Sequence, residues 1–278
     1  IDFSPSQRSV SIFTSAFRVM VIGGGVAGLC AAFIAKEKGH EVTLYEAGDV
    51  LGGNMRLAAY PPGKGDITNM IRSYIHRCQK DGVKIVMNCE VTPELIKEEK
   101  PDSVIIATGS KTLILPIEGI DNPAIIHGSD LLDGKRPAGK KVLVVGGGMV
   151  GCETAAFLGE QEHDVTVIEF RDTVGADVIH EHRVYLMKDF EDYGIKEITG
   201  AKVCKFYEDG VEYETADGVR HETRGYDSVI LSMGFRNYNP LEEKIKDLVP
   251  ETHVIGDAIR ARRALDATKE AYEVASRL

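Results

Sequence analysis

The fold is decided by Val19-Met-Val-Ile-Gly-Gly-Gly-Val-Ala-Gly28 and by its second copy, Val142-Leu-Val-Val-Gly-Gly-Gly-Met-Val-Gly151, which follows 123 residues later. Each copy runs on to a strand that ends in an acid, Glu46 or Glu169, 18 residues after the last glycine. Over 28 residues the two copies agree at 12 positions. Strand, glycine turn, helix, strand and acid form the fingerprint of a dinucleotide-binding unit. Two such units predict two dinucleotides held together, with electrons passing between them.

The glycines and the acid have separate roles in each unit. The first glycine permits a tight turn, the second lets a pyrophosphate approach the backbone, and the third lets helix and strand pack closely. The helix that follows offers N–H groups and the positive end of its dipole to the phosphates. The acid can accept hydrogen bonds from the adenosine ribose. The predicted contacts are Gly23, Gly25, Gly28 and Glu46 in the first unit, and Gly146, Gly148, Gly151 and Glu169 in the second.

The acid of the second unit bears on the choice of pyridine nucleotide. A carboxylate at Glu169 receives the 2′-hydroxyl of NADH and repels the 2′-phosphate of NADPH, so we predict NADH, with NADPH as the weaker ligand. Arg171, two residues on, complicates this preference, because its side chain either faces a phosphate or stacks on adenine. Glu162 stands where the first unit has Gly39, which is a departure from the repeat.

Other residues have two interpretations from the sequence. Asp257, after Gly256, either holds a polyol such as a ribityl chain or caps the last helix. Arg56 and Lys64 either meet an anionic cofactor or are solvated loop residues. Glu153 lies either beside a nicotinamide or simply near a helix N-terminus, where the dipole favours an acid.

Composition and charge exclude several classes of protein. The net charge of −10 argues against nucleic acid or an anionic membrane as a partner, and the uncharged run 19–35 is short for a membrane span. Five cysteines, no two closer than eleven residues, exclude a CxxC pair and are a poor basis for a zinc or iron–sulfur site. They predict a reducing, cytoplasmic setting. His180 and His182 point to different sides of a predicted helix, so we expect no metal site.

The chain of 278 residues is long enough for two domains. We predict an α/β fold with two Rossmann-like dinucleotide-binding domains, the second inserted in the first, and a small antiparallel meander. The predicted segments are a linker or artificial extension (1–17), a first domain (18–115 plus 232–278) and a second domain (116–231). Helices are predicted near 66–80, 93–98, 177–193 and 264–278, and strands at 84–89, 103–109, 142–146, 201–207, 211–215, 219–223 and 253–256.

These motifs resemble the C-terminal FAD/NAD(P)H module of 2-enoate reductases, 2,4-dienoyl-CoA reductases and trimethylamine dehydrogenase-like enzymes, which are old-yellow-enzyme relatives. The resemblance runs from about Arg18 to Leu278. Related disulfide reductases share both fingerprints but use a pair of redox cysteines that is not found here. The stretches that carry the resemblance are Gly52-Gly-Asn-Met-Arg-Leu-Ala58, Pro62-Gly-Lys64, Arg72-Ser-Tyr74, Gly256-Asp-Ala258 and Arg262-Arg-Ala-Leu-Asp-Ala267.

The resemblance implies FAD in the first unit and the nicotinamide cofactor in the second, with Glu153 and Gly234 near the latter. The first glycine motif, with Ala27, would hold the FAD pyrophosphate. Asp257, after Gly256, would bind the ribityl chain, and the last helix would present Ala264 to the isoalloxazine ring. The flavin side would be lined by Gly53, Asn54, Arg56 and Gly109.

Family members also carry an upstream barrel with FMN and a 4Fe–4S centre, neither of which this sequence encodes. The resemblance therefore implies a reductase module that passes hydride from NADH to FAD and electrons onward to that barrel, which reduces an activated C=C bond. The barrel of the same polypeptide is the expected partner, and a homo-oligomer is possible. Diaphorase activity with artificial acceptors would be the module's own chemistry, and an NADH oxidase is the corresponding type of enzyme. The alternatives are a separate NAD(P)H reductase for a ferredoxin-like acceptor and a nucleotide-binding module without turnover.

Overall fold

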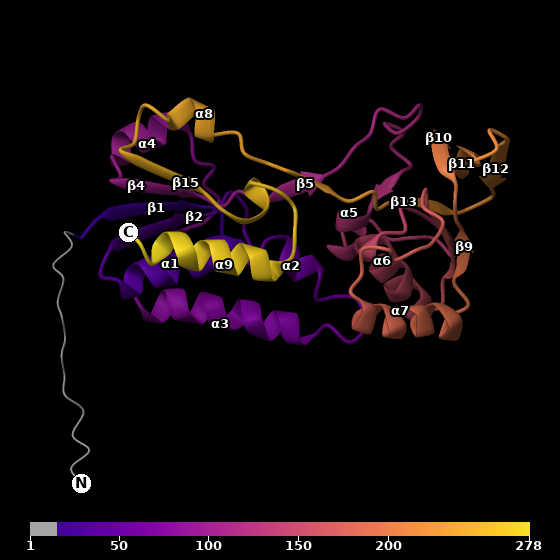
Figure 1. The fold of residues 1–278 in the computed structure, drawn as a ribbon, viewed down its shortest axis with the longest axis horizontal. Helices are drawn as coiled ribbons and strands as arrows, with labels where there is room; N and C mark the ends of the chain where they lie inside the picture. The colour runs from indigo at the N-terminus through magenta and orange to yellow at the C-terminus, as the bar shows by residue number, and fades with distance from the viewer. Residues whose placement is uncertain (1–15) are drawn as a thin grey trace, which may run out of the picture.

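A computed structural model describes residues 16–278, which form two α/β lobes side by side (Figure 1). Most of the predicted linker, residues 1–15, lies outside the described residues. Phe17, at the end of that segment, packs against the core of the first lobe, and its ring stacks on His40 with centroids 5.5 Å apart. The first lobe thus includes residue 17 of the segment predicted as a linker.

The first lobe is built on a parallel five-stranded sheet with the order β15-β4-β1-β2-β3. Helix α1 is buried between this sheet and helices α3 and α9, and its small residues Ala31 and Ala35 allow α9 to approach closely. Helices α4 and α8 lie over the other face (Figure 1). The strands are β1 (Arg18–Ile22), β2 (Glu41–Tyr45), β3 (Lys84–Val86), β4 (Ser103–Ile106) and β15 (Glu251–Val254), and the helices are α1 (Val26–Glu37), α2 (Asn54–Leu57), α3 (Asp66–Lys80), α4 (Pro93–Glu99), α8 (Glu242–Ile245), η1 (Gly256–Ala258) and α9 (Ala264–Ala275).

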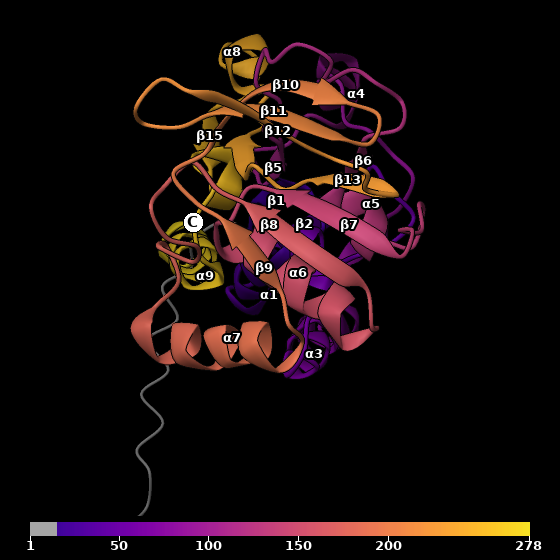
Figure 2. The ribbon, with the colours of Figure 1, turned by 90° about the vertical axis from the view of Figure 1, so that its right-hand side faces the viewer.

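The second lobe repeats this arrangement with the parallel order β6-β13-β7-β8-β9. An antiparallel sheet, β10-β11-β12, packs on one face, while α6 and α7 lie on the other (Figure 2). The predicted fold class, including the meander, is confirmed. The elements are β6 (Ile126–His127), α5 (Gly128–Leu132), β7 (Lys141–Val145), α6 (Met149–Glu160), β8 (Asp164–Ile168), α7 (His180–Asp192), β9 (Lys196–Ile198), β10 (Lys202–Tyr207), β11 (Gly210–Glu214), β12 (Arg220–Arg224) and β13 (Ser228–Leu231).

A two-stranded antiparallel link joins the lobes. The chain leaves the first lobe through β5 (Ser110–Thr112) and returns through β14 (Phe235–Asn237). The second lobe is therefore an insertion between β4 and β15 of the first. The predicted domain boundaries fall beside this link and remain a prediction.

Several predicted elements are shorter than expected, among them the strand predicted at 103–109, which ends at Ile106, and the helix predicted at 264–278, which ends at Ala275. The strand predicted at 84–89 ends at Val86, because Asn88 has a φ of 54°, which a strand does not accommodate. The helix predicted at 177–193 begins only at His180. The uncharged run 19–35 divides between β1 and α1, and none of the helices within residues 16–278 combines the length and apolar character needed to cross a membrane.

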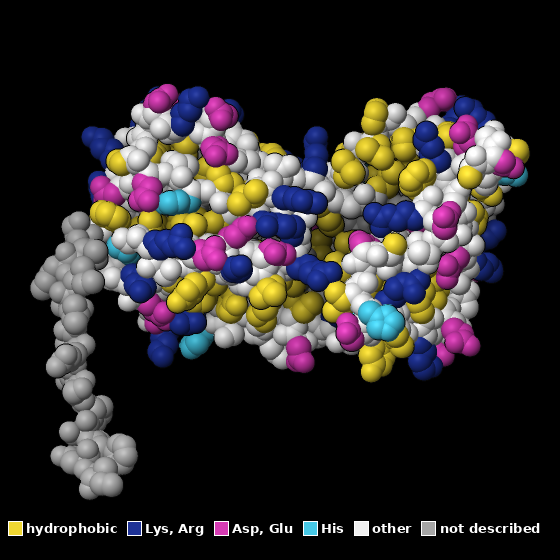
Figure 3. All heavy atoms as spheres, in the orientation of Figure 1, with side chains coloured by type: hydrophobic (Ala, Val, Ile, Leu, Met, Phe, Trp, Pro, Cys, Tyr) yellow, Lys and Arg dark blue, Asp and Glu magenta, His cyan; other side chains and the backbone are white. Residues whose placement is uncertain are grey.

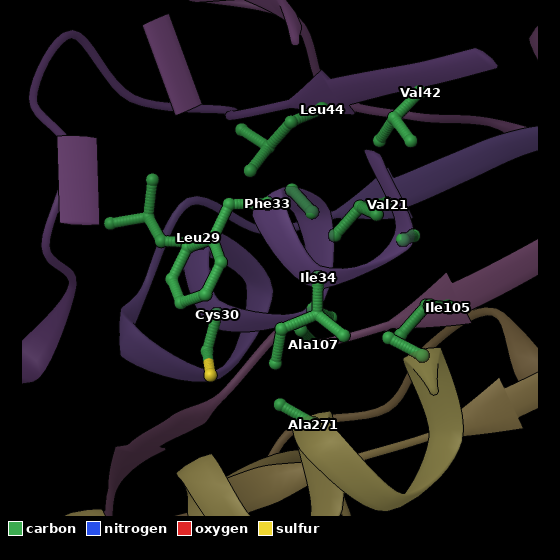
Figure 4. Packing of buried hydrophobic residues seen from close by; sticks show 14 of the residues in the cluster. Val21, Leu29, Cys30, Phe33, Ile34, Val42, Leu44, Ile105, Ala107 and Ala271 are labelled. Atoms are coloured by element: carbon green, nitrogen blue, oxygen red, sulfur yellow. The ribbon is translucent and has the colours of Figure 1, made fainter. Parts of the chain in front are cut away.

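The packing of β4 against α1 and α9 gives a prediction for stability. Ile105 is completely buried and lies close to Ile34 and Ala271 (Figure 4). Ile105→Ala should lower the free energy of unfolding by about 2–5 kcal/mol, because it removes buried surface and leaves a cavity. Urea denaturation measures the change. Ile114, which is 49% exposed, is the matched control, and Ile114→Ala should cost about 0.5 kcal/mol or less. Equal losses in the two variants would contradict this account of the core.

Candidate functional site

A cavity of about 560 Å³ lies where the two lobes meet. Lys and Arg side chains gather over this central region on the face shown in Figure 3, and Arg262 and Arg263 belong to the cavity wall. The cavity brings together most of the residues predicted for the first cofactor and two predicted for the second. The predicted residues that line it are Gly23, Gly25, Ala27, Glu46, Gly53, Asn54, Gly109, Glu153, Gly234, Asp257 and Ala264.

The three glycines of the first turn differ in what surrounds them. A Cβ atom on Gly28 would lie 1.9 Å from the carbonyl oxygen of Gly23, and one on Gly23 would lie 2.3 Å from that of Ala107. Gly25, with a φ of −73°, has no atom within 4 Å of its Cβ position. It precedes α1, whose first N–H groups have no partner within the helix. This open cradle at a helix N-terminus fits a pyrophosphate.

The two strand-end acids make the same pair of bonds in each lobe. Glu46 accepts hydrogen bonds from the N–H groups of Gly24 and Gly48, both at 2.7 Å. Glu169 accepts from those of Gly147 at 2.6 Å and Arg171 at 2.9 Å. A carboxylate has about four lone-pair sites. Each acid therefore shapes its turn and keeps acceptor capacity for ribose hydroxyls.

Asp257 is held at the wall of the first cavity. Its carboxylate accepts hydrogen bonds from the hydroxyl of Ser110 at 2.9 Å and from the backbone N–H of Arg262 at 3.1 Å. The alternative that Asp257 caps the last helix is wrong, because α9 begins at Ala264 and its N-cap is Arg263. The position suits contact with a polyol.

A second cavity, of about 300 Å³, lies along the glycine turn of the second lobe. Gly146, Gly148, Glu169 and Gly234 line it. So does Ser232, whose buried hydroxyl has no hydrogen-bond partner among the described residues. Since an unpaired buried hydroxyl is destabilising, a polar ligand group at this point would satisfy it. The site therefore fits a nucleotide.

The two cavities share part of their walls. Met149, Val150, Asp177 and Gly234 line both of them. Met149 and Val150 begin α6, Gly234 follows β13, and Asp177 comes from the loop before α7. Ligands in the two cavities would therefore be neighbours.

Arg56 and Lys64 form ion pairs between the lobes, so the alternative that they are merely solvated is wrong. Arg56 contacts Asp133 at 2.5 Å, and this guanidinium, together with Lys135, holds the pKa of Asp133 below its usual range. Lys64 contacts Glu153, a buried residue that His182 also approaches at 3.4 Å. These pairs fix one lobe against the other.

Four predicted cofactor residues do not line either cavity: Gly28, Arg56, Gly151 and Gly256. The sequence interpretation missed others that do, among them Ser110, Asp177 and Ser232. A signal for Asp177 was present, because it stands 123 residues after Asn54 and so occupies the same place in the repeat. Nothing local distinguishes Ser110 or Ser232 from other serines.

Comparison with known proteins identifies a family. The family model of pyridine nucleotide-disulphide oxidoreductases matches residues 17–255. The chain is 33% identical over 273 residues to the bilirubin reductase of Mediterraneibacter gnavus, covering 97% of this chain and 42% of that protein. It is 34% identical over 264 residues to the NADH oxidase of Thermoanaerobacter brockii, covering 93% of this chain and 40% of that protein.

A solved structure is similar over nearly the whole chain. It is 2-naphthoyl-CoA reductase in complex with 2-naphthoyl-CoA, with a TM-score of 0.90 and 31% sequence identity. The match covers 95% of this chain and 40% of that one. This chain thus spans about two fifths of the length of these relatives.

The cysteines give a prediction for thiol chemistry. Burial raises the pKa of Cys30 to about 11 and of Cys78 and Cys152 to about 12. Because a raised pKa keeps a thiol protonated, about one part in a thousand or less of each is thiolate at pH 8. Only the half-buried Cys89 and Cys204 should react rapidly with a disulfide reagent such as DTNB at that pH.

The measurement is a timed count of released thiolate. We expect two thiols in the native protein and five after unfolding, since all five cysteines are free. Cys204→Ser should reduce the rapid count to one. A third rapidly reacting thiol in the native wild-type chain would contradict the burial argument.

Proposed function

The chain belongs to the pyridine nucleotide-disulphide oxidoreductase family, which binds FAD and NAD(P)H, and from this premise we propose that it is a reductase module moving electrons from NADH through FAD to an acceptor outside this sequence. The observation that carries the proposal is the wall shared by the two cavities, lined on both sides by Met149, Val150, Asp177 and Gly234. Two dinucleotides in adjoining sites are placed to exchange electrons directly.

The first lobe is the proposed FAD site. The N-terminus of α1 and Gly25 would take the pyrophosphate, Glu46 the adenosine ribose and Asp257 the ribityl chain. Gly53, Asn54 and Gly109 would line the flavin side, with Ala264 at the start of α9. The task of these residues is to bind and orient the cofactor.

The second lobe is the proposed site of the pyridine nucleotide. Gly146, Gly148 and the hydroxyl of Ser232 would contact it, and Glu169 would accept the ribose 2′-hydroxyl. The Glu169 carboxylate is fixed by two backbone N–H groups, so it cannot easily turn away from a 2′-phosphate. This supports the preference for NADH. When both cofactors are bound, the nicotinamide supplies a hydride and the flavin accepts it.

The proposed electron acceptor is a barrel carrying FMN and an iron–sulfur centre, which reduces an activated C=C bond. The greater length of the relatives supports a further functional part, since the chain spans about two fifths of each. Two of those relatives are named bilirubin reductase and 2-naphthoyl-CoA reductase, which are reductases of conjugated molecules.

A glycine substitution tests the FAD site. Gly25→Ala should fold, since no protein atom lies within 4 Å of the new methyl group and the φ of −73° suits alanine. The methyl group would occupy the phosphate cradle, and we expect FAD affinity to fall by about tenfold or more. Titration of FAD into apoprotein, followed by flavin fluorescence, measures this.

The matched control is Gly65→Ala. Gly65 is also a helix N-cap glycine, has a φ of −55° and is equally open, but it does not line either cavity. It should cost similar stability and leave FAD affinity unchanged. Unaltered FAD affinity in Gly25→Ala would contradict the assignment of the α1 N-terminus to the FAD site.

An anaerobic visible spectrum tests the reaction. The FAD-loaded chain should show the flavin band, which should bleach faster with NADH than with NADPH. Glu169→Gln should reduce the NADH-to-NADPH preference by roughly tenfold, because it removes both the acceptor and the repulsive charge. Glu46→Gln is the counterpart in the first lobe and should weaken FAD retention without changing that preference.

The outcomes separate the alternatives. If the chain stays colourless after FAD is added, the result would contradict the reductase hypothesis and favour a nucleotide-binding module without turnover. Faster bleaching with NADPH would overturn the choice of cofactor. Rapid reduction by NADH of a separately supplied ferredoxin would favour the separate reductase instead of the module.

A further inference from the structure

The two helix N-termini that face the nucleotide sites have the same backbone but different surroundings. Helices α1 and α6 each have twelve residues and a glycine N-cap, with φ and ψ of −73° and −177° at Gly25 and −72° and −176° at Gly148. No atom lies within 4 Å of the Cβ position of Gly25. At Gly148, the carboxylate of Asp177 lies 3.3 Å from that position.

In the repeat, Asp177 of the second lobe occupies the position equivalent to Asn54 of the first lobe. In both lobes the glycine two residues before this position donates its N–H to the carbonyl oxygen of the middle glycine of the turn. Gly52 donates to Gly24 at 2.8 Å, and Gly175 donates to Gly147 at 2.7 Å. The register is therefore the same up to this point. After it, the first lobe has a neutral amide, whereas the second has an acid.

The two side chains make different contacts. Asn54 donates to the backbone carbonyl and hydroxyl of Ser110, which belongs to β5. Asp177 turns toward α6, and its Oδ1 accepts the backbone N–H of Met149 at 2.9 Å. Its carboxylate thereby takes up one of the N–H groups that the glycine turn otherwise offers to a phosphate.

A carboxylate and a pyrophosphate compete for such a position. Both are attracted by the free N–H groups and the positive end of the helix dipole, and two anions within a few ångströms repel each other. The flanking residues Val174 and Val178 are buried, so they fix the backbone on both sides of Asp177. Asp177 itself is exposed, so its side chain has solvent to turn into.

We propose that Asp177 is an internal competitor of the pyridine nucleotide, whose carboxylate opposes the nucleotide pyrophosphate at the N-terminus of α6 and so sets the affinity of the second site. This rests on the proposed function, in which the second lobe binds that nucleotide. Competition at this point weakens the binding of NADH and NAD⁺ alike and speeds their exchange. The first lobe, with Asn54 at the equivalent place, has no such competitor and suits a cofactor that stays bound.

The opposite role for Asp177 predicts the opposite result. Because Asp177 lines both cavities, its carboxylate is also in a position to accept a hydrogen bond from a ribose hydroxyl of the nucleotide. An acid that binds a hydroxyl strengthens nucleotide binding, and its removal weakens it. The sign of the change in affinity therefore decides between the two roles.

The test is calorimetric titration of FAD-loaded protein with ADP-ribose, which carries the pyrophosphate of NADH but no nicotinamide and so does not reduce the flavin. Asp177→Asn removes the charge and keeps an oxygen that can cap α6, since Asn and Asp are equally good in this role. We expect the dissociation constant to fall by about three- to tenfold. The gain should shrink at high salt, because screening weakens charge repulsion.

Two controls isolate the charge at the phosphate. Asp172→Asn makes the same change in net charge on the same loop, at an exposed residue that does not line either cavity, and should leave the affinity unchanged. Adenosine, which has no phosphate, should bind wild type and Asp177→Asn equally. Asp177→Ala, which also removes the cap, should bind ADP-ribose at least as tightly as Asp177→Asn does.

Failure of this inference is distinguishable from failure of the proposed function. If ADP-ribose binds wild type and Asp177→Asn equally, or binds the variant more weakly, the competition is overturned while the nucleotide site stands. If ADP-ribose binds neither protein, the assignment of the second lobe and the role of Asp177 are overturned together. If Asp172→Asn gains the same affinity for ADP-ribose as Asp177→Asn, the change in net charge alone would explain the effect, and this result would also overturn the proposal.

Discussion

One close approach, made twice, determines the rest of the structure: the third glycine of each motif lies directly against the carbonyl of the first. A Cβ atom would come within 1.9 Å of the Gly23 oxygen at Gly28, and within 1.8 Å of the Gly146 oxygen at Gly151. Backbone meets backbone here, so no neighbouring side chain can move aside. Because each helix starts in contact with its turn, its N-terminus is aimed past the end of the strand, where the cavities lie.

Around this contact the two lobes repeat the same hydrogen bonds between the strand-end acid and backbone N–H groups. The lobes differ in the side chains of residues whose backbone makes these bonds. The strand-end acid ties the turn to the loop in both, through the N–H of Gly48 in one and of Arg171 in the other. These backbone bonds do not depend on the side chain at that position. The two lobes thus share a scaffold and differ at a few positions of it, such as Gly48 and Arg171, or Asn54 and Asp177.

Local pattern predicted the units because each is contiguous in sequence, and most of the predicted glycines and all of the predicted acids line the cavities. The ion pair of Arg56 with Asp133 could not be predicted, since its members are 77 residues apart and follow no periodicity. The late start of α7 also has a long-range cause. Asp177 does not enter that helix, because its carboxylate binds the N–H of Met149 at the N-terminus of α6, 28 residues earlier in the sequence. The cap role for Asp257 could have been excluded from the predicted start of the last helix at 264, because an N-cap residue directly precedes its helix, and the N-cap of α9 is Arg263.

The orientation of the lobes depends on a short segment that also forms the flavin side of the first cavity. Between residues 54 and 64, Asn54 and Leu57 face the cavity, while Tyr60 packs on Phe157 of the other lobe and Lys64 pairs with Glu153. Within residues 16–278, the sheet that otherwise connects the lobes is the link of β5 with β14. Glu153 is buried, so loss of its partner would leave an uncompensated charge, which is far costlier than loss of a surface pair. The segment that would contact the flavin is therefore also the one whose side chains hold the second lobe, through Arg56, Tyr60 and Lys64.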